Sequence, residues 1–169
     1  MRVLEVGTAV GFSALLMSEY VPEECAITTI EKFMRREYRS QDKIFLSVQE
    51  KRRKITLLEG DAMDVLKTLE GPYDFIFMDA AKGQYIHYLP EILRLLAKGG
   101  ILVSDNVMQD GDVIESRFAV ERRDRTIHAR MREYLYELKH NDALVTSIIP
   151  LGDGVALSVK KEVGTDIAQ

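Results

Sequence analysis

Short apolar runs alternate along this chain with longer stretches in which apolar residues recur every three or four positions. The runs do not alternate with polar residues and are rich in Val, Ile, Leu and Phe, which is typical of parallel strands covered on both faces. They predict strands at 3–7, 26–31, 54–58, 74–79 and 100–105. The stretches between them predict helices at 13–20, 33–50, 62–69 and 85–97, the last of which is expected to stop at Gly99 and Gly100.

The last quarter of the chain shows a different pattern. A further helical stretch contains Ile127, Met131 and Leu138, and the segment "ALVTSIIPLGDGVALSVKK" follows it. That segment predicts two strands joined by a Gly-Asp-Gly turn, and therefore an antiparallel pair. No repeat or linker interrupts residues 1–169. We predict a single α/β domain with a Rossmann-like, doubly wound sheet that is mostly parallel and ends in an antiparallel strand pair.

Composition narrows the class of protein. No apolar run approaches the ~20 residues needed to span a bilayer, and no cationic, apolar leader opens the chain. The single cysteine, Cys25, suits a reducing compartment. We therefore expect a cytoplasmic protein without a membrane partner.

The net charge of −4 does not favour nucleic-acid binding. However, residues 117–132 include six arginines, which form either a solvated helix face or a phosphate-binding surface.

Glycines and carboxylates follow the first three predicted strands. Gly7 and Gly11 have a G-x-x-x-G spacing, which differs from the G-x-G-x-x-G of dinucleotide sites. Glu5 could face a cationic ligand, and Glu31 closes the second strand, where a carboxylate can bind a ribose diol. After the third strand, three residues could border an adenine: Gly60, Asp61 and Ala62. Each acid alone is compatible with a solvated strand end, but the ordered set favours an adenosyl ligand without phosphates, such as S-adenosylmethionine.

A second group of polar residues follows the fourth and fifth strands. Asp79 ends the fourth strand, and Asp105 and Asn106 end the fifth. Their oxygens are the type of ligand that Mg²⁺ prefers, so the pattern predicts a site for a divalent cation. Lys82 lies three residues after Asp79. It is either a surface lysine or, beside a cation in a pocket of low dielectric constant, a candidate base.

Several motifs resemble those of the cation-dependent class I O-methyltransferases, the family that contains catechol and caffeoyl-CoA methyltransferases. These motifs are "VLEVGTAVGFS", "TIEK", "GDA", "MDAAKGQY", "GGILVSDNV" and "DGVALS". Within that family, "DAAKGQY", "ERRDRT" and "IIPLGDGVALS" most closely resemble the bacterial tRNA 5-hydroxyuridine methyltransferases. The resemblance implies the class I methyltransferase fold, S-adenosylmethionine as methyl donor, Mg²⁺ or another divalent cation, a tRNA substrate and a homodimer.

The resemblance also implies roles for individual residues. Those implied to contact the methyl donor are Glu5, Gly7, Gly11, Ser13, Glu31, Asp61, Ala62 and Asp79. Within this set, Gly7, Gly11 and Ser13 would line the methionine part, Glu31 would hold the ribose, and Asp61 and Ala62 would border the adenine. The metal ligands would be Asp79, Asp105 and Asn106, and the catalytic residues Lys82 and Asp79. The arginines implied to bind RNA are Arg122, Arg123 and Arg125.

The expected reaction is metal-dependent methyl transfer to 5-hydroxyuridine at the tRNA wobble position, which gives 5-methoxyuridine. The alternatives are methylation of a small catechol or phenolic ester, and a non-catalytic module that binds the methyl donor.

Two features depart from the family pattern. The chain begins at the first strand without the usual preceding helical segment, so we expect a truncated form or a misplaced start codon. Ala80 and Ala81 stand where catechol enzymes have bulky aromatic residues, which favours a roomier pocket.

Overall fold

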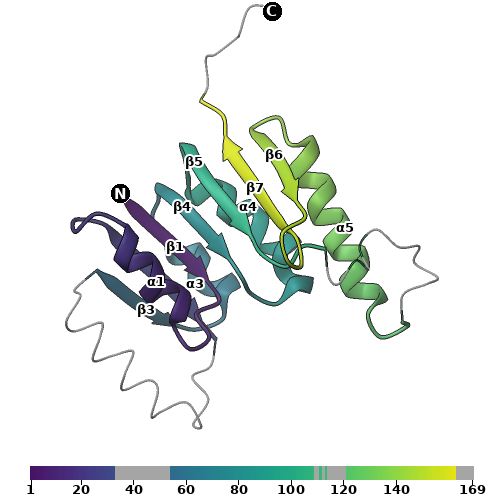
Figure 1. The fold of residues 1–169 in the computed structure, drawn as a ribbon, viewed down its shortest axis with the longest axis horizontal. Coiled ribbons are helices and arrows are strands. Elements are labelled where there is room, and N and C mark those ends of the chain that lie inside the picture. The colour runs from purple at the N-terminus through teal and green to yellow at the C-terminus, as the bar shows by residue number, and fades with distance from the viewer. Residues whose placement is uncertain (33–53, 109–110, 112, 114–120, 163–169) are drawn as a thin grey trace, which may run out of the picture.

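A seven-stranded sheet forms the centre of the protein, in the order β3-β2-β1-β4-β5-β7-β6 (Figure 1). The computed structural model describes residues 1–32, 54–108, 111, 113 and 121–162. The parallel strands are β1 (Arg2–Val6), β2 (Ala26–Glu31), β3 (Ile55–Glu59), β4 (Tyr73–Met78) and β5 (Leu96–Ser104). β7 (Val155–Lys160) runs antiparallel to both β5 and β6 (Leu144–Ile149). The predicted sheet, with its C-terminal antiparallel pair, is confirmed.

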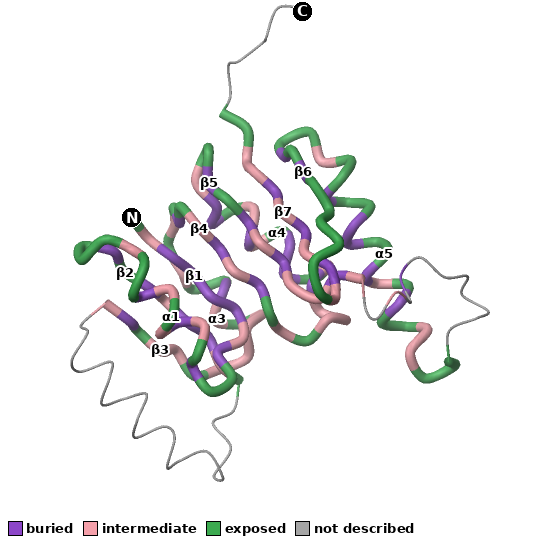
Figure 2. Tube along the Cα trace, viewed as in Figure 1, coloured by how far each residue is buried: buried purple, intermediate pink, exposed green. Residues whose placement is uncertain are grey.

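Helices cover both faces of this sheet. α1 (Phe12–Tyr20) packs on one face, where Ala14 joins a buried cluster with Val3 and Ile27. The opposite face buries Leu4 and Val6 under α3 (Ala62–Thr68), α4 (Tyr85–Leu95) and α5 (Arg125–His140). Neighbouring residues of β1 therefore enter different clusters, as expected for a strand with two covered faces. In Figure 2 the central strand β1 is mostly buried, whereas the edge strand β6 is largely exposed.

The boundary between α4 and β5 differs from the prediction. The helix ends at Leu95 rather than residue 97, and β5 begins at Leu96 rather than residue 100. Leu96 is buried and pairs with Tyr73 of β4, so a position that fits the helical period belongs to the sheet. The Lys160 ammonium donates hydrogen bonds to the carbonyls of Leu93 and Leu96, at 2.7 and 2.8 Å. It thereby satisfies carbonyl groups that the end of the helix leaves unpaired.

The topology brings the carboxyl ends of five strands to one edge of the sheet. β1 pairs with β2 on one side and with β4 on the other, so the strand order reverses beside β1. Open α/β sheets bind their ligands at such a switch point. The predicted helix at 33–50 lies outside the described residues. In the described part of the chain, no helix has the length and apolar character that a membrane span requires.

Candidate functional site

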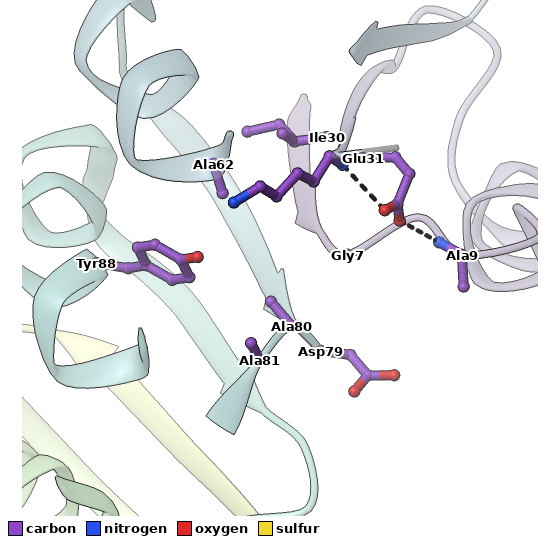
Figure 3. A pocket seen from close by; sticks show the side chains of 10 residues that line it. Gly7, Ala9, Ile30, Glu31, Ala62, Asp79, Ala80, Ala81 and Tyr88 are labelled. Atoms are coloured by element: carbon purple, nitrogen blue, oxygen red, sulfur yellow. Dashed lines mark hydrogen bonds between the residues drawn. The ribbon is translucent and has the colours of Figure 1, made fainter. Parts of the chain in front are cut away.

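A pocket of about 270 Å³ lies at the switch point, beyond the ends of β1, β2 and β4 (Figure 3). Four of the predicted ligand-binding residues line it: Gly7, Glu31, Ala62 and Asp79. The sequence reasoning did not assign a ligand role to six other lining residues, which are Ala9, Ile30, Lys32, Ala80, Ala81 and Tyr88. Five of these six directly flank a predicted site residue or lie within two positions of one. Their closeness in sequence to predicted site residues could therefore have identified them.

Gly7 allows the turn after β1 to lie directly against the end of β4. Its φ of +104° lies in the left-handed region, and a Cβ atom there would stand 2.0 Å from the Asp79 carbonyl oxygen. The backbone N–H groups of Gly7 and Thr8 both donate to the Ile30 carbonyl, at 3.0 and 3.1 Å. Only glycine combines this backbone conformation with such a close approach. The turn therefore joins the ends of three strands around the pocket.

Glu31 presents a carboxylate whose two oxygens are oriented by backbone N–H groups. Ala9 donates to Oε2 at 2.8 Å and Lys32 donates to Oε1 at 2.9 Å, as the dashed lines in Figure 3 show. A carboxylate oxygen accepts more than one hydrogen bond, so an oriented carboxylate can also receive two neighbouring hydroxyl groups. The geometry at the end of β2 is that expected of a residue that binds a diol.

Asp61 and Tyr88 shape the other side of the pocket. Asp61 caps α3 by accepting the Met63 N–H at 3.0 Å, and it pairs with the Lys32 ammonium at 2.6 Å. These contacts, the Lys32 hydrogen bond foremost, lower the pKa of Asp61. Asp61 therefore fixes the start of α3, while its neighbour Ala62 lines the pocket. Tyr88 of α4 turns its ring toward the cavity, and burial raises the pKa of its hydroxyl (Figure 3).

Glu5 is fully buried in β1. Its two carboxylate oxygens accept hydrogen bonds from the hydroxyls of Ser13 and Thr29, and the Thr29 hydroxyl also lies 2.5 Å from that of Thr8. Burial raises the pKa of Glu5, although both hydroxyl contacts act in the opposite direction. Four predicted donor-binding residues are absent from the pocket lining, namely Glu5, Gly11, Ser13 and Asp61. The structure thus places Glu5 among internal hydroxyls, and its contact with a ligand stays a prediction.

Next to the pocket, the predicted metal ligands gather around the ammonium group of Lys82. Lys82 Nζ lies 2.8 Å from Asp79 Oδ1, 3.1 Å from Asn106 Oδ1, 3.2 Å from the Asp105 carbonyl oxygen and 3.0 Å from the Tyr85 hydroxyl. We call these four oxygens the oxygen cage. The Asp105 carboxylate itself accepts the Asn106 N–H at 2.7 Å. The sequence placed these residues together and left Lys82 as either a surface lysine or a base beside a cation; the structure puts its ammonium group among the predicted ligands.

The oxygens of the cage are of the chemical type that a hard divalent cation binds. Carboxylate and amide oxygens are ligands that Mg²⁺ accepts, and here they come from the ends of two adjacent strands, β4 and β5. Among the described residues, no group of three or more His, Cys, Asp and Glu side chains could hold a metal ion. The predicted set contains only two carboxylates, since its third member is Asn106. A divalent cation would therefore share these oxygens with Lys82 or displace it.

The arginine-rich segment leads into α5, whose first half packs against the short helix η2 (Lys82–Gln84). Arg130 donates a hydrogen bond to the Gly83 carbonyl at 3.2 Å. Arg123 is 79% exposed at its side chain and pairs with Glu121 at 3.0 Å and with Asp124 at 3.3 Å. Arg125 and Arg130 thus lie on the helix that packs against η2, whereas Arg123 precedes this helix and is partly neutralised by its acidic neighbours.

Comparisons with known proteins identify the family to which the chain is similar. A family model described as O-methyltransferase matches residues 1–161. A catechol O-methyltransferase of Niastella koreensis is 33% identical over 121 residues, which cover 68% of this chain and 52% of that protein. Caffeoyl-CoA O-methyltransferase 5 of Nicotiana tabacum is 32% identical over 172 residues, covering 92% of this chain and 67% of that protein.

Among solved structures, the S-adenosylhomocysteine-bound methyltransferase PaMTH1 of Podospora anserina matches with a TM-score of 0.80. It is 28% identical in sequence, and the match covers 95% of this chain and 72% of that protein. The chain spans between about half and two thirds of the length of the two curated relatives named above.

Proposed function

This chain belongs to the O-methyltransferase family, and from that premise we propose that it transfers a methyl group from S-adenosylmethionine to a hydroxyl group. One observation carries the proposal. Asp79 lines the pocket at the switch point and also belongs to the oxygen cage, so a donor pocket and a proton-accepting site share a residue. A methyltransferase needs its donor pocket and its acceptor site to adjoin, because the donor carbon and the acceptor oxygen must meet within one site.

In the donor pocket, Glu31 would bind the ribose hydroxyls with its two oriented oxygens. Ala62 and Tyr88 would flank the adenine, while Asp61 holds the start of α3 in place. The methionine part would extend along the turn from Gly7, toward Gly11 and Ser13. The S-adenosylhomocysteine bound to PaMTH1, which shares this fold, supports a donor of that type.

In the acceptor site, Lys82 would act as the general base that takes the proton of the acceptor hydroxyl. The acceptor oxygen then forms a bond to the methyl carbon as the carbon–sulfur bond breaks, and the electron pair leaves with sulfur. Three residues would hold a divalent cation: Asp79, Asp105 and Asn106. When bound, such a cation lowers the pKa of a hydroxyl that it coordinates. The chain's main contribution is to position the two reactants and to stabilise the acceptor oxyanion.

For the acceptor, we propose 5-hydroxyuridine at the tRNA wobble position. Support comes from the arginine-rich segment at the start of α5, where Arg122, Arg123 and Arg125 would contact phosphates near η2. Small side chains at Ala80 and Ala81, both in the pocket lining, leave room for a bulky acceptor. A second candidate is a catechol or phenolic ester, which is favoured by the identity to the named catechol and caffeoyl-CoA enzymes.

Two measurements test the proposal. The first is calorimetry with S-adenosylhomocysteine on the wild type, Glu31→Gln and the control Glu59→Gln. Glu59 ends β3 opposite Glu31 in the sheet register but does not line the pocket. Because a hydrogen bond to a charged group contributes about 1.5–3 kcal/mol, Glu31→Gln should weaken binding by about tenfold or more. Equal affinity in all three proteins would overturn the donor assignment.

The second measurement identifies the acceptor by mass spectrometry of products. The chain is incubated with S-adenosylmethionine and magnesium, together with tRNA containing 5-hydroxyuridine or with caffeoyl-CoA. Formation of 5-methoxyuridine is the expected result. Methylated caffeoyl-CoA with unchanged 5-hydroxyuridine would favour the second candidate. Binding of S-adenosylhomocysteine without turnover of either acceptor would instead indicate a non-catalytic module.

A further inference from the structure

The hydroxyl of Tyr85 connects the ends of two strands with the Lys82 side chain. Tyr85 is the first residue of α4 and is fully buried. Its hydroxyl donates toward the carbonyls of Met78, at 2.9 Å, and Asp105, at 3.2 Å. The same oxygen accepts hydrogen bonds from the Ala80 N–H at 3.3 Å and from Lys82 Nζ at 3.0 Å. A phenolic hydroxyl has one hydrogen and two lone pairs, so every hydrogen-bonding position of Tyr85 is used.

Two of the four cage oxygens are side-chain oxygens of the predicted metal set, those of Asp79 and Asn106. When these two side chains engage a cation, their oxygens are less available to Lys82. The Tyr85 hydroxyl, the only other side-chain oxygen of the cage, then remains as an anchor for Lys82, together with the backbone carbonyl of Asp105. This contact holds Lys82 in position while the carboxylates serve another ligand.

We propose that Tyr85 is a positioning residue of the methyl-transfer site, whose hydroxyl fixes Lys82 against the ends of β4 and β5. The inference rests on the proposed function for the part that Lys82 takes in the reaction. The anchoring itself is a property of the chain, and it is therefore testable without turnover.

The matched pair of variants is Tyr85→Phe and Tyr134→Phe. Tyr134 is also fully buried, and its ring packs edge-on against that of Tyr85, with centroids 5.4 Å apart. Its hydroxyl forms a hydrogen bond with the Ser104 hydroxyl at 2.5 Å, and within the described part of the chain it contacts neither Lys82 nor a cage oxygen. Each variant thus removes one buried hydroxyl and keeps the ring. Thermal melting of both proteins identifies any general loss of folding.

The first readout is the rate at which acetic anhydride labels Lys82, measured by mass spectrometry with and without magnesium chloride. Lys160, whose ammonium is held by two carbonyls of the α4–β5 junction, is the internal reference. Tyr85→Phe should raise the labelling of Lys82 by several-fold relative to Lys160, whereas Tyr134→Phe should leave the ratio unchanged. Equal ratios in the two variants would overturn the proposal, whether or not the chain is an active enzyme.

The second readout is steady-state kinetics with whichever of the two acceptors above is methylated. Misplacing Lys82 should lower kcat by about tenfold, which corresponds to about 1.4 kcal/mol of barrier, and leave KM nearly unchanged. The Tyr85→Phe change should have no further effect in a Lys82→Met background. An equal loss in both backgrounds would assign Tyr85 a purely structural role. Absence of turnover in the wild type would refute the proposed function, and the labelling ratio would still decide the role of Tyr85.

Discussion

The close approach of the β1 turn to β4 makes Gly7→Ala the most informative single substitution. The added methyl carbon would lie 2.0 Å from the Asp79 carbonyl oxygen, 2.7 Å from its carbon and 3.2 Å from the Ala80 Cα. All three atoms belong to backbone, so no side-chain rotation can relieve the overlap. The end of β4, which lines the pocket, has to move away from β1.

The structure sets the expected size of this effect. A left-handed φ costs a non-glycine residue about 1–2 kcal/mol, and forcing an extra carbon into a packed region costs about 1–3 kcal/mol. The free energy of unfolding should therefore fall by about 2–5 kcal/mol in Gly7→Ala. Gly152 is the matched control, because its φ is +56° but nothing lies within 4 Å of its hypothetical Cβ. Gly152→Ala should show only the backbone cost of about 1–2 kcal/mol.

Urea unfolding of the two variants measures these energies, and calorimetry measures the affinity of the pocket for S-adenosylhomocysteine. Gly7→Ala should lose affinity by about tenfold or more, because Asp79 and Ala80 both line the pocket. Gly152→Ala should bind as the wild type does. If the two variants unfold with the same free energy and bind equally well, the turn after β1 does not shape the pocket and the reasoning is refuted.

Three further predictions concern other parts of the site. Burial raises the pKa of Glu5 above its ordinary value of 4.5, so the wild type should lose stability as the pH rises through the folded-state pKa. Glu5→Gln should make the melting temperature depend less on pH above 4.5, and parallel pH profiles for the two proteins would contradict this. Asp105→Ala should weaken magnesium binding in calorimetry without changing affinity for S-adenosylhomocysteine, and unchanged magnesium affinity would exclude Asp105 as a ligand. Replacing Arg122, Arg123 and Arg125 by Ala should weaken tRNA binding in a filter assay and make its salt dependence shallower by about 2 to 3 in slope, whereas an unchanged slope would remove these arginines from the RNA surface.

The sequence predicted the sheet well because the signal for a parallel strand is strong and local. Unalternating apolar runs located the strands to within one or two residues at most ends, and the rule that parallel strands end at one edge brought Gly7, Glu31 and Asp79 together. The boundary between α4 and β5 was missed because Leu96 satisfies both a helical period and a buried strand position. Periodicity cannot distinguish these two environments for a single apolar residue.

Contacts between side chains of different helices and strands could not be predicted from the sequence. Nothing local indicates that Lys82 reaches Asn106, or that Tyr85 spans the ends of two strands, because both contacts depend on how η2 and the start of α4 lie against the ends of β4 and β5. Glu5 shows the same limit. Its position in β1 suggested a ligand contact, but which way its carboxylate points is decided by Ser13 and Thr29, from other elements.

The central claim is that the pocket at the switch point holds an S-adenosyl methyl donor. A crystal structure of this chain grown with S-adenosylhomocysteine measures this directly. The ribose hydroxyls should lie within hydrogen-bonding distance of the Glu31 carboxylate, with the sulfur on the side of Asp79 and the oxygen cage. The account would be contradicted if the adenosine part of the ligand were bound elsewhere, or if the Glu31 carboxylate contacted only solvent while the ligand is present.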